Sequence, residues 1–364
     1  MQDWQVYKQE AEPVAELMKL INDGYRVAYE FDKDDYREGN PFIEEGKGAP
    51  REKWGIDLSK IAPNTTGGHL HWGNKIEQLR EHILYFVVSQ AVENQKELQT
   101  FFRDREEDLQ DHYRNAYRNL TNAWRDEYAL ASPIGASSEE RTNVAEWKII
   151  QAYYCVYKAT SALLRCKYSN IRTSRGGSHT SMWEFHRINS MDTLESKLYA
   201  FPFLYFPNDD NPRSNDYFNW IVPYPINEEF EIDQANTQDK YVENSLSNIY
   251  EKAKQIPYFE NKNMITFYDL LQWLREWAQY QRGGIFSRLY GTTHIKAIDD
   301  ALRLVAYTGI AIAEVAFICS FGLHKFYYIY KQYRESCEAG NVLDSQYFVS
   351  NRYDVYSNAL SDFT

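Results

Sequence analysis

Residues 74–132 contain neither glycine nor proline, and this uninterrupted stretch constrains the fold more than any other part of the sequence. Large apolar side chains recur along it every three or four residues: Leu109, Tyr113, Tyr117, Leu120, Trp124 and Tyr128. This spacing places them on one face of an α-helix, so the stretch predicts one very long helix, about 90 Å if continuous, or two nearly collinear helices. Asn115, Asn119 and Asn122 are weak helix formers, and we expect any bend to lie near them.

Three later segments also have helical periodicity, at about residues 140–167, 266–280 and 294–337. Pro133 and Gly135 separate the first of these segments from the long stretch before it. Amphipathic helices of this kind bury their apolar faces by packing against other elements. The sequence therefore predicts a mainly all-α protein, built as a helical bundle with long helices.

Glycine and proline divide the rest of the chain. Eight of the 17 glycines fall within residues 24–73, so we interpret residues 1–73 as a loop-rich N-terminal elaboration. Residues 74–199 then hold the long helix and a helical core with a basic loop. Residues 200–262 contain six of the 11 prolines and predict an irregular insertion with room for a small β-hairpin. Residues 263–364 are expected to complete the bundle with C-terminal helices.

The composition limits the classes of partner. With 52 acidic and 40 basic residues the formal net charge is -12, so a nucleic acid can be attracted only by a local basic site. The 30 tyrosines and 19 phenylalanines indicate tyrosine-rich helical surfaces that suit a protein partner or a homodimer. The four cysteines form no C-x-x-C pair, and the N-terminal residues lack a long apolar run, which together predict a cytoplasmic protein.

No cofactor or metal is expected from the motifs. The sequence has no phosphate-binding loop of the Walker type, no dinucleotide fingerprint and no nucleophile elbow. His69 and His71 could supply two metal ligands, but no cysteine or carboxylate stands at a recognisable distance from them. Glu260 and Lys262 match the short pattern of a metal-dependent nuclease only in their spacing, without well-formed strands around them.

The connection after the 140–167 helix is the strongest candidate for a chemical site. Seven basic or histidine residues lie there against a single acidic one, Glu184: Arg165, Lys167, Arg172, Arg175, His179, His186 and Arg187. A guanidinium can hold a phosphate while a nearby imidazole moves a proton at a hydroxyl or leaving oxygen, with no metal. Arg172 and His179 are the predicted catalytic pair, and the other five are predicted nucleic-acid-binding residues. The alternative is that these cations pair with the acidic residues near 106–111.

A second pair has similar spacing. Arg288 precedes His294, with Gly291 and two threonines between them that indicate a helix start, so His294 is expected in a first helical turn. Arg288 and His294 are therefore also predicted catalytic residues, and a site that uses both pairs requires folding or dimerisation to bring them together. The alternative is that His294 simply faces solvent.

The helical segment 152–165, followed by the basic loop and His179, resembles the core helix and following turn of HEPN-like helical proteins, and also the YaaC-like family. The resemblance covers about forty residues and extends vaguely to the last helix. It implies a helical bundle, often dimeric, and for active members an Arg–His ribonuclease in prokaryotic toxin and anti-phage systems. Thr173 and Leu289 follow the two arginines where active members commonly carry a polar residue, and leucine departs from that pattern most.

One segment is apolar enough to be considered for a membrane. Residues 304–323 are dominated by apolar side chains and interrupted by Glu314. A stripe of small residues at helical spacing would let another helix approach closely: Ala306, Gly309, Ala313, Ala316 and Ser320. We expect a buried central helix whose small residues face the 74–132 helix, rather than a membrane span.

These observations lead to three hypotheses. The first is a HEPN-like effector that cuts or binds RNA through its Arg–His pairs, as part of a prokaryotic defence or toxin-type system. The second is a non-catalytic helical interaction subunit of a larger anti-phage defence complex. The third is a membrane-anchored sensor that uses residues 304–323.

Overall fold

The computed structural model describes the protein over a defined set of residues, and nearly all of these are helical with none in a strand. The predicted all-α class is thereby confirmed for the described part of the chain. The N-terminal elaboration, the 200–262 insertion with its hairpin, and the histidines near residue 70 lie outside it. The described residues are 80, 84, 87, 88, 90–105, 109–131, 145–168, 171, 179–186, 189, 194, 198, 267–276, 278, 279, 292–339 and 345–363.

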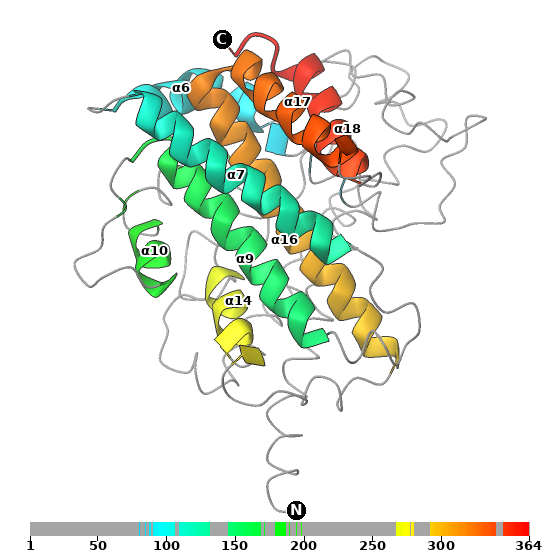
Figure 1. The fold of residues 1–364 in the computed structure, drawn as a ribbon. Coiled ribbons are helices and arrows are strands. Elements are labelled where there is room, and N and C mark those ends of the chain that lie inside the picture. Colours follow the sequence, from blue (N-terminus) through cyan, green and yellow to red (C-terminus); the bar gives the residue numbers. More distant parts are fainter. Residues whose placement is uncertain are drawn as a thin grey trace, which may run out of the picture. The chain divides into compact units, whose positions relative to one another are not determined.

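Eight helices are labelled in Figure 1. They are α6 (Gln95–Arg103), α7 (Leu109–Ala131), α9 (Ala145–Arg165), α10 (His179–His186), α14 (Phe267–Glu276), α16 (Thr292–Phe321), α17 (Leu323–Ala339) and α18 (Ser345–Ala359). The chain forms two compact units, one from residues 1–37, 130–153 and 200–305, the other from residues 38–129, 154–199 and 306–364. The features discussed below lie in the second unit unless stated otherwise.

The first unit contains α14 and the first part of α9. The predicted helix at 266–280 is confirmed as α14, which buries Tyr268, Leu271 and Leu274 on one face. The guanidinium of Arg275 lies 5.3 Å from the ring centroid of Tyr153, a cation–π contact within this unit.

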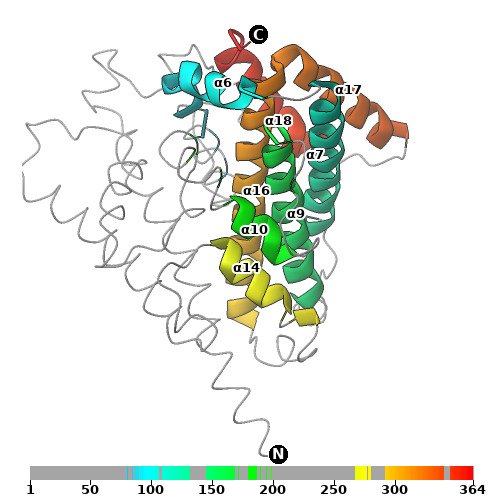
Figure 2. The ribbon, with the colours of Figure 1, turned by 90° about the vertical axis from the view of Figure 1, so that its left-hand side faces the viewer.

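The predicted long helix at 74–132 is broken between α6 and α7, whereas α7 is continuous through Asn115–Asn122, where a bend was expected. Figure 2 shows α6 running crosswise to the direction of α7 instead of in line with it. Asp104 leaves the helical conformation with ψ of 86°. Arg105 then turns inward and donates hydrogen bonds to the carbonyl of Cys166 and to Ser320, at 2.7–2.9 Å. These tertiary contacts outweigh the local helix propensity.

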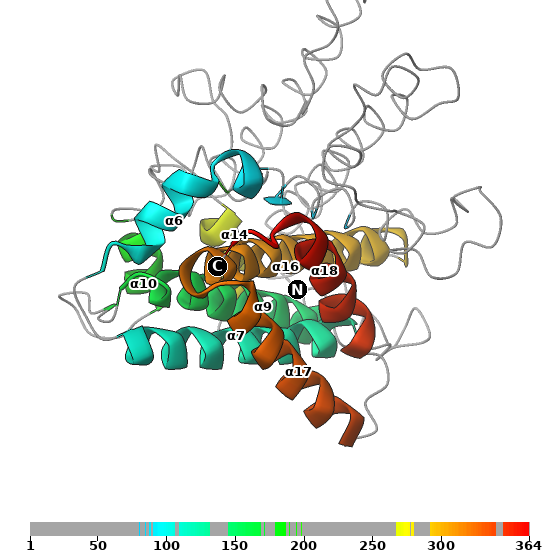
Figure 3. The same cartoon turned by 90° about the horizontal axis from the view of Figure 1, so that it is seen from above.

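The predicted last helix at 294–337 is also two helices, α16 and α17. Gly322 separates them with φ of 88°, a left-handed conformation that costs other residues about 1–2 kcal/mol. Its N–H donates to the carbonyl of Ile318, and the N–H of Leu323 donates to the carbonyl of Phe363. The turn sends α17 in a new direction, away from the axis of α16 (Figure 3).

The apolar segment Leu302–Phe321 of α16 is buried. It is long and apolar enough to span a membrane by length and composition, yet all of it lies inside the protein. All five residues of the small stripe are buried, and Ser320 at its end donates to the carbonyl of Cys166 at the end of α9. The ring contacts from α16 to α7 come from large side chains, with Phe317 and Phe321 lying 5.7 and 5.5 Å from the Tyr113 ring.

Helix α18 was not predicted as a separate element. Its buried residues Val349, Arg352, Tyr356 and Leu360 follow helical spacing, but the pattern is incomplete if only apolar side chains are counted. An arginine occupies the centre of the buried face. The reason lies in the charged groups that it meets on α7 and α16.

Candidate functional site

The predicted site residues that the structure describes lie at or near the ends of helices. Arg165 ends α9, Lys167 follows it, and His186 ends α10. The expectation that His179 lies in a loop is wrong, because it is the first residue of α10. His294 lies in the first turn of α16, as expected. Of the remaining residues, Arg172, Arg175, Arg187 and Arg288 lie outside the described residues, as do the side chains of the two histidines.

The end of α9 is held by donors from other helices. The last carbonyls of a helix have no partner within it and must be satisfied from outside. The carbonyl of Cys166 accepts from Arg105 and Ser320, and Nδ1 of His112 lies 3.0 Å from the carbonyl of Arg165. Because a carbonyl can only accept, this contact places the imidazole proton on Nδ1. The start of the basic connection therefore has a fixed position.

Helix α10 is tied to the same framework through its C-terminal half. The hydroxyl of Tyr168 donates to the carbonyl of Asn189 at 2.7 Å, and its ring meets that of Phe185 edge to face at 5.1 Å. The ring of Tyr157 on α9 meets that of Trp183 on α10 in the same way at 5.8 Å. The connection between Tyr168 and His179 thus begins at an anchored point and leads into a helix that is held by its C-terminal half.

The described cations of this region differ in their surroundings. The ammonium of Lys167 donates to the carbonyl of Phe101 at 2.8 Å, and lies 3.8 Å from the carboxylate of Asp104. Burial lowers the pKa of Lys167, and the charge of Asp104 raises it in part. His186 is fully buried, and burial lowers its pKa to about 3, so its imidazole is neutral at pH 7. His186 therefore brings no positive charge to this region at neutral pH.

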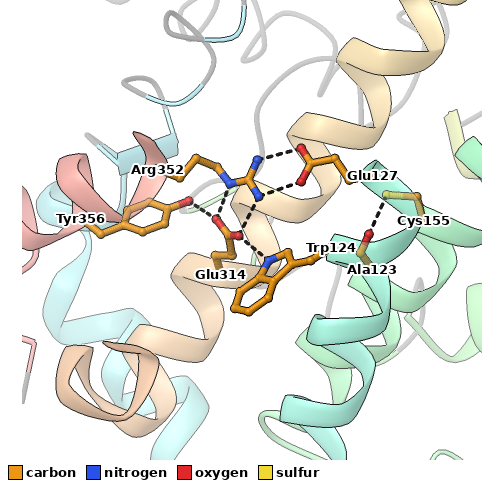
Figure 4. A network of polar contacts seen from close by, with 7 residues as sticks. All are labelled: Ala123, Trp124, Glu127, Cys155, Glu314, Arg352 and Tyr356. Atoms are coloured by element: carbon orange, nitrogen blue, oxygen red, sulfur yellow. Dashed lines mark hydrogen bonds and ion pairs between the residues drawn. The ribbon is translucent and has the colours of Figure 1, made fainter. Parts of the chain in front are cut away.

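A second group of polar residues forms the buried charge cluster, which we define as Trp124, Glu127, Tyr307, Glu314, Arg352 and Tyr356. Figure 4 shows all of these except Tyr307. Three helices each supply two of its members. Trp124 and Glu127 are three residues apart on α7, Tyr307 and Glu314 seven apart on α16, and Arg352 and Tyr356 four apart on α18. Each of these spacings places both side chains on the same face of its helix.

Arg352 lies at the centre of the cluster and contacts both carboxylates. It donates two hydrogen bonds to Glu127, at 2.7 and 2.9 Å, and two to Glu314, at 2.7 and 2.9 Å. Both carboxylates are thus bound in a bidentate manner by one guanidinium. Trp124 Nε1 and the Tyr356 hydroxyl donate one further bond each to Glu314, at 2.6 and 2.7 Å.

The cluster holds one positive and two negative groups. The guanidinium of Arg352 also lies 5.0 Å from the ring centroid of Tyr307, and the buried Arg80 lies 5.6 Å from the same ring. Burial raises the pKa of Glu314, which the charge and hydrogen bonds of Arg352 offset only in part. Burial lowers the pKa of Arg352, but Glu127 and Glu314 together raise it more, so Arg352 stays charged.

The buried charge cluster can join helices but cannot receive a substrate from solvent. Arg352, Glu314 and Tyr356 have no exposed surface, and Glu127 is 4% exposed. Sequence reasoning noted Glu314 only as an interruption of an apolar run and missed the other members. The available signal was a carboxylate on a helix otherwise apolar enough to be buried, since such a group requires a cationic partner.

Metal ligands are not clustered in the described part of the chain. No group of three or more histidine, cysteine, aspartate or glutamate side chains is placed there to hold a metal ion. All four cysteines are free thiols, and Cys155, Cys166 and Cys319 are buried. Cys155 donates to the carbonyl of Ala123 at 3.5 Å, which joins α9 to α7 beside the charge cluster (Figure 4).

No protein-family model, curated protein or solved structure matches the chain significantly. Its function is therefore argued from its own residues.

Proposed function

We propose that this protein is a HEPN-like, RNA-cutting effector of a prokaryotic defence or toxin-type system, with the connection between α9 and α10 as its active segment. The observation that supports this proposal is the anchoring of the two helices, α9 and α10, that the segment connects. Donors from α16 and from the α6–α7 region hold the end of α9, and Tyr157 and Tyr168 hold α10 by its aromatic residues. Catalytic and binding residues commonly lie on loops that a rigid framework positions in this way.

The proposed chemistry needs no metal. Arg172 holds the scissile phosphate, while His179 takes the proton of the RNA 2′-hydroxyl. The 2′-oxygen then bonds to phosphorus as the bond to the 5′-oxygen breaks. That oxygen leaves with a proton from a second imidazole, which His179 of a partner copy supplies. Arg288 and His294 are the alternative pair for the same chemistry. The products are a 2′,3′-cyclic phosphate and a 5′-hydroxyl, so all atoms and protons balance.

The test incubates purified protein with labelled single-stranded RNA in the presence of EDTA. We expect cleavage that His179→Ala reduces by about 100-fold or more, the usual contribution of a general acid or base. Lys96→Ala, an exposed change on α6, serves as the matched control and should leave the rate unchanged. Product ends are identified by mass spectrometry. Absence of cleavage, or cleavage that survives both His179→Ala and His294→Ala, would refute the proposal.

A second proposal is a non-catalytic interaction subunit, and the exposed aromatic side chains support it. Trp147 is 66% exposed in the first unit, and Tyr328 on α17 of the second unit is 55% exposed. Large aromatic residues of this kind are enriched in protein interfaces. Inactivity towards RNA together with a stable dimer or a larger complex in light scattering would favour this second function. The membrane-anchored alternative predicts that the protein requires detergent, although Leu302–Phe321 is buried throughout.

A further inference from the structure

Exposed positive charge is in excess on α7 and α17. Among the described side chains of these two helices, six exposed lysines and arginines stand against two exposed carboxylates, Asp111 and Glu335. The six are Arg114, Arg118, Arg125, Lys325, Lys331 and Arg334. This local excess is opposite in sign to the net charge of -12 carried by the whole chain. A local basic region is what a polyanion needs in order to bind an acidic protein.

The two helices form one continuous surface. The ammonium of Lys325 lies 5.4 Å from the ring centroid of Tyr113, and the Tyr117 hydroxyl donates to Gln332 at 3.4 Å. Beneath these contacts, the Trp124 ring lies 5.0 Å from that of Tyr333. Figures 1 and 3 show α17 beside α7 in both views. Residues of both helices can therefore contact one bound chain.

The arginines of α7 lie in one row. Arg114, Arg118 and Arg125 are separated by four and seven residues, which places them on one side of the helix. Tyr113 and Tyr117 precede the first two arginines, and so lie on the neighbouring side. Their rings are nearly parallel, with centroids 6.3 Å apart and an interplanar angle of 12°. A row of cations therefore runs next to a row of flat rings, and α17 adds the exposed ring of Tyr328.

We propose that this α7–α17 surface binds single-stranded nucleic acid, with arginine and lysine on the phosphates and the tyrosine rings against the bases. Cations that follow a backbone and aromatic rings that stack on bases are the two features of single-strand recognition without a base code. A duplex keeps its bases stacked inside, so it could use the cations but not the rings. Arginine and tyrosine are also enriched in protein interfaces, so the row of cations on one side of α7 is what favours a polyanion here, and binding of a protein partner is an outcome that the test distinguishes.

The proposal does not rest on the Arg172–His179 chemistry, since the two sites share no residue. The surface could hold RNA for cleavage at the α9–α10 connection, or could bind it when no cleavage occurs. A failure of one proposal therefore leaves the other intact, and two assays distinguish them.

The binding test uses fluorescence anisotropy with three labelled oligonucleotides: a mixed-sequence single-stranded RNA, the same sequence as single-stranded DNA, and the RNA duplex. We expect single strands to bind more tightly than the duplex, with an affinity that falls as salt rises. The double change Arg114→Gln and Arg118→Gln should weaken binding to every sequence by roughly tenfold, and should lower the salt slope by about two. The two single strands show whether the 2′-hydroxyl contributes.

A matched control variant also loses two positive charges, at positions outside the proposed surface. Lys96→Gln with Arg103→Gln removes two exposed cations from α6, outside the surface, and should leave binding unchanged. Tyr328→Ala removes an exposed ring without emptying the core, and should weaken single-strand binding by roughly 5- to 100-fold but duplex binding little. Circular dichroism melts confirm that each variant is folded.

Three results would overturn the proposal. The first is that the arginine variant and its control bind single strands equally well. The second is that the duplex binds more tightly than single strands and Tyr328→Ala does not change its affinity, and the third is that the protein binds only acidic peptides. Cleavage measurements on the same variants separate the two sites. Changes in the α7–α17 surface should raise KM for RNA with kcat unchanged, whereas His179→Ala should abolish kcat and leave anisotropy binding intact.

Discussion

Replacing Arg352 with methionine should destabilise the fold more than any exposed charge change. Methionine keeps most of the side-chain length but removes the four hydrogen bonds to Glu127 and Glu314. Two buried carboxylates then have no guanidinium between them. Breaking a buried ion pair in this way costs about 3–5 kcal/mol, because the remaining charge is left uncompensated. Since a whole domain is stable by only about 5–15 kcal/mol, the loss should be easily measured by urea unfolding.

The loss of stability caused by Arg352→Met should increase as pH rises. Burial already raises the carboxyl pKa of Glu314, and without Arg352 nothing offsets this effect, so the pKa in the folded protein lies further above its unfolded value. The folded state then binds more protons than the unfolded state, so the variant loses stability as pH rises through that range. The difference in unfolding free energy between wild type and Arg352→Met should therefore be smaller at pH 5 than at pH 8.

Two further variants make this prediction specific. Adding Glu127→Gln and Glu314→Gln to Arg352→Met removes the stranded charges and should recover part of the lost stability. Lys331→Met removes an exposed ion pair with Glu335, whose atoms are 4.0 Å apart, and should cost no more than about 0.5 kcal/mol. A cost below about 1 kcal/mol for Arg352→Met, or a difference that grows as pH falls, would refute the reasoning.

Two other changes follow from the structure. Gly322→Ala should destabilise the protein by about 1–2 kcal/mol in urea unfolding, because alanine resists the φ of 88° that ends α16; an unchanged midpoint would contradict this. In native protein at pH 8, a thiol reagent should modify Cys337 quickly and the other three cysteines slowly, since Cys337 alone is partly exposed and burial raises the pKa of the others. Rapid reaction of all four thiols before denaturant is added would show that these helices open.

The helices themselves could be predicted from short-range patterns. Periodic apolar residues and the absence of glycine and proline located α9, α14 and most of α7 and α16, because helix formation depends on side chains within one or two turns. The two breaks were missed for different reasons. Gly322 was visible in the sequence, but a single glycine within an apolar helix is often tolerated. The break before α7 has no local marker, since Arg105 is drawn inward by Ser320 and the end of α9.

The proposed functional residues also divide into those that a local sequence pattern reveals and those that only tertiary contacts reveal. The basic segment around Arg172 and His179 could be located as a local excess of charge, whereas the row of arginines on α7 was hidden within an acidic chain. Its functional interest depends on the neighbouring helix, because Tyr113 and Tyr117 form a common surface with α17 only after the turn at Gly322.

The amino-acid order by itself determined the helical class, the approximate helix positions and the burial of the apolar helix, all of which follow from periodicity and composition. Only the tertiary structure decided which charges meet. Arg352 bonds directly to Glu314, which is 38 residues away in the sequence, and to Glu127, which is 225 residues away. No local sequence pattern relates these residues. Packing of α7, α16 and α18 removes all three from water, and a buried charge is stable only where folding supplies its opposite.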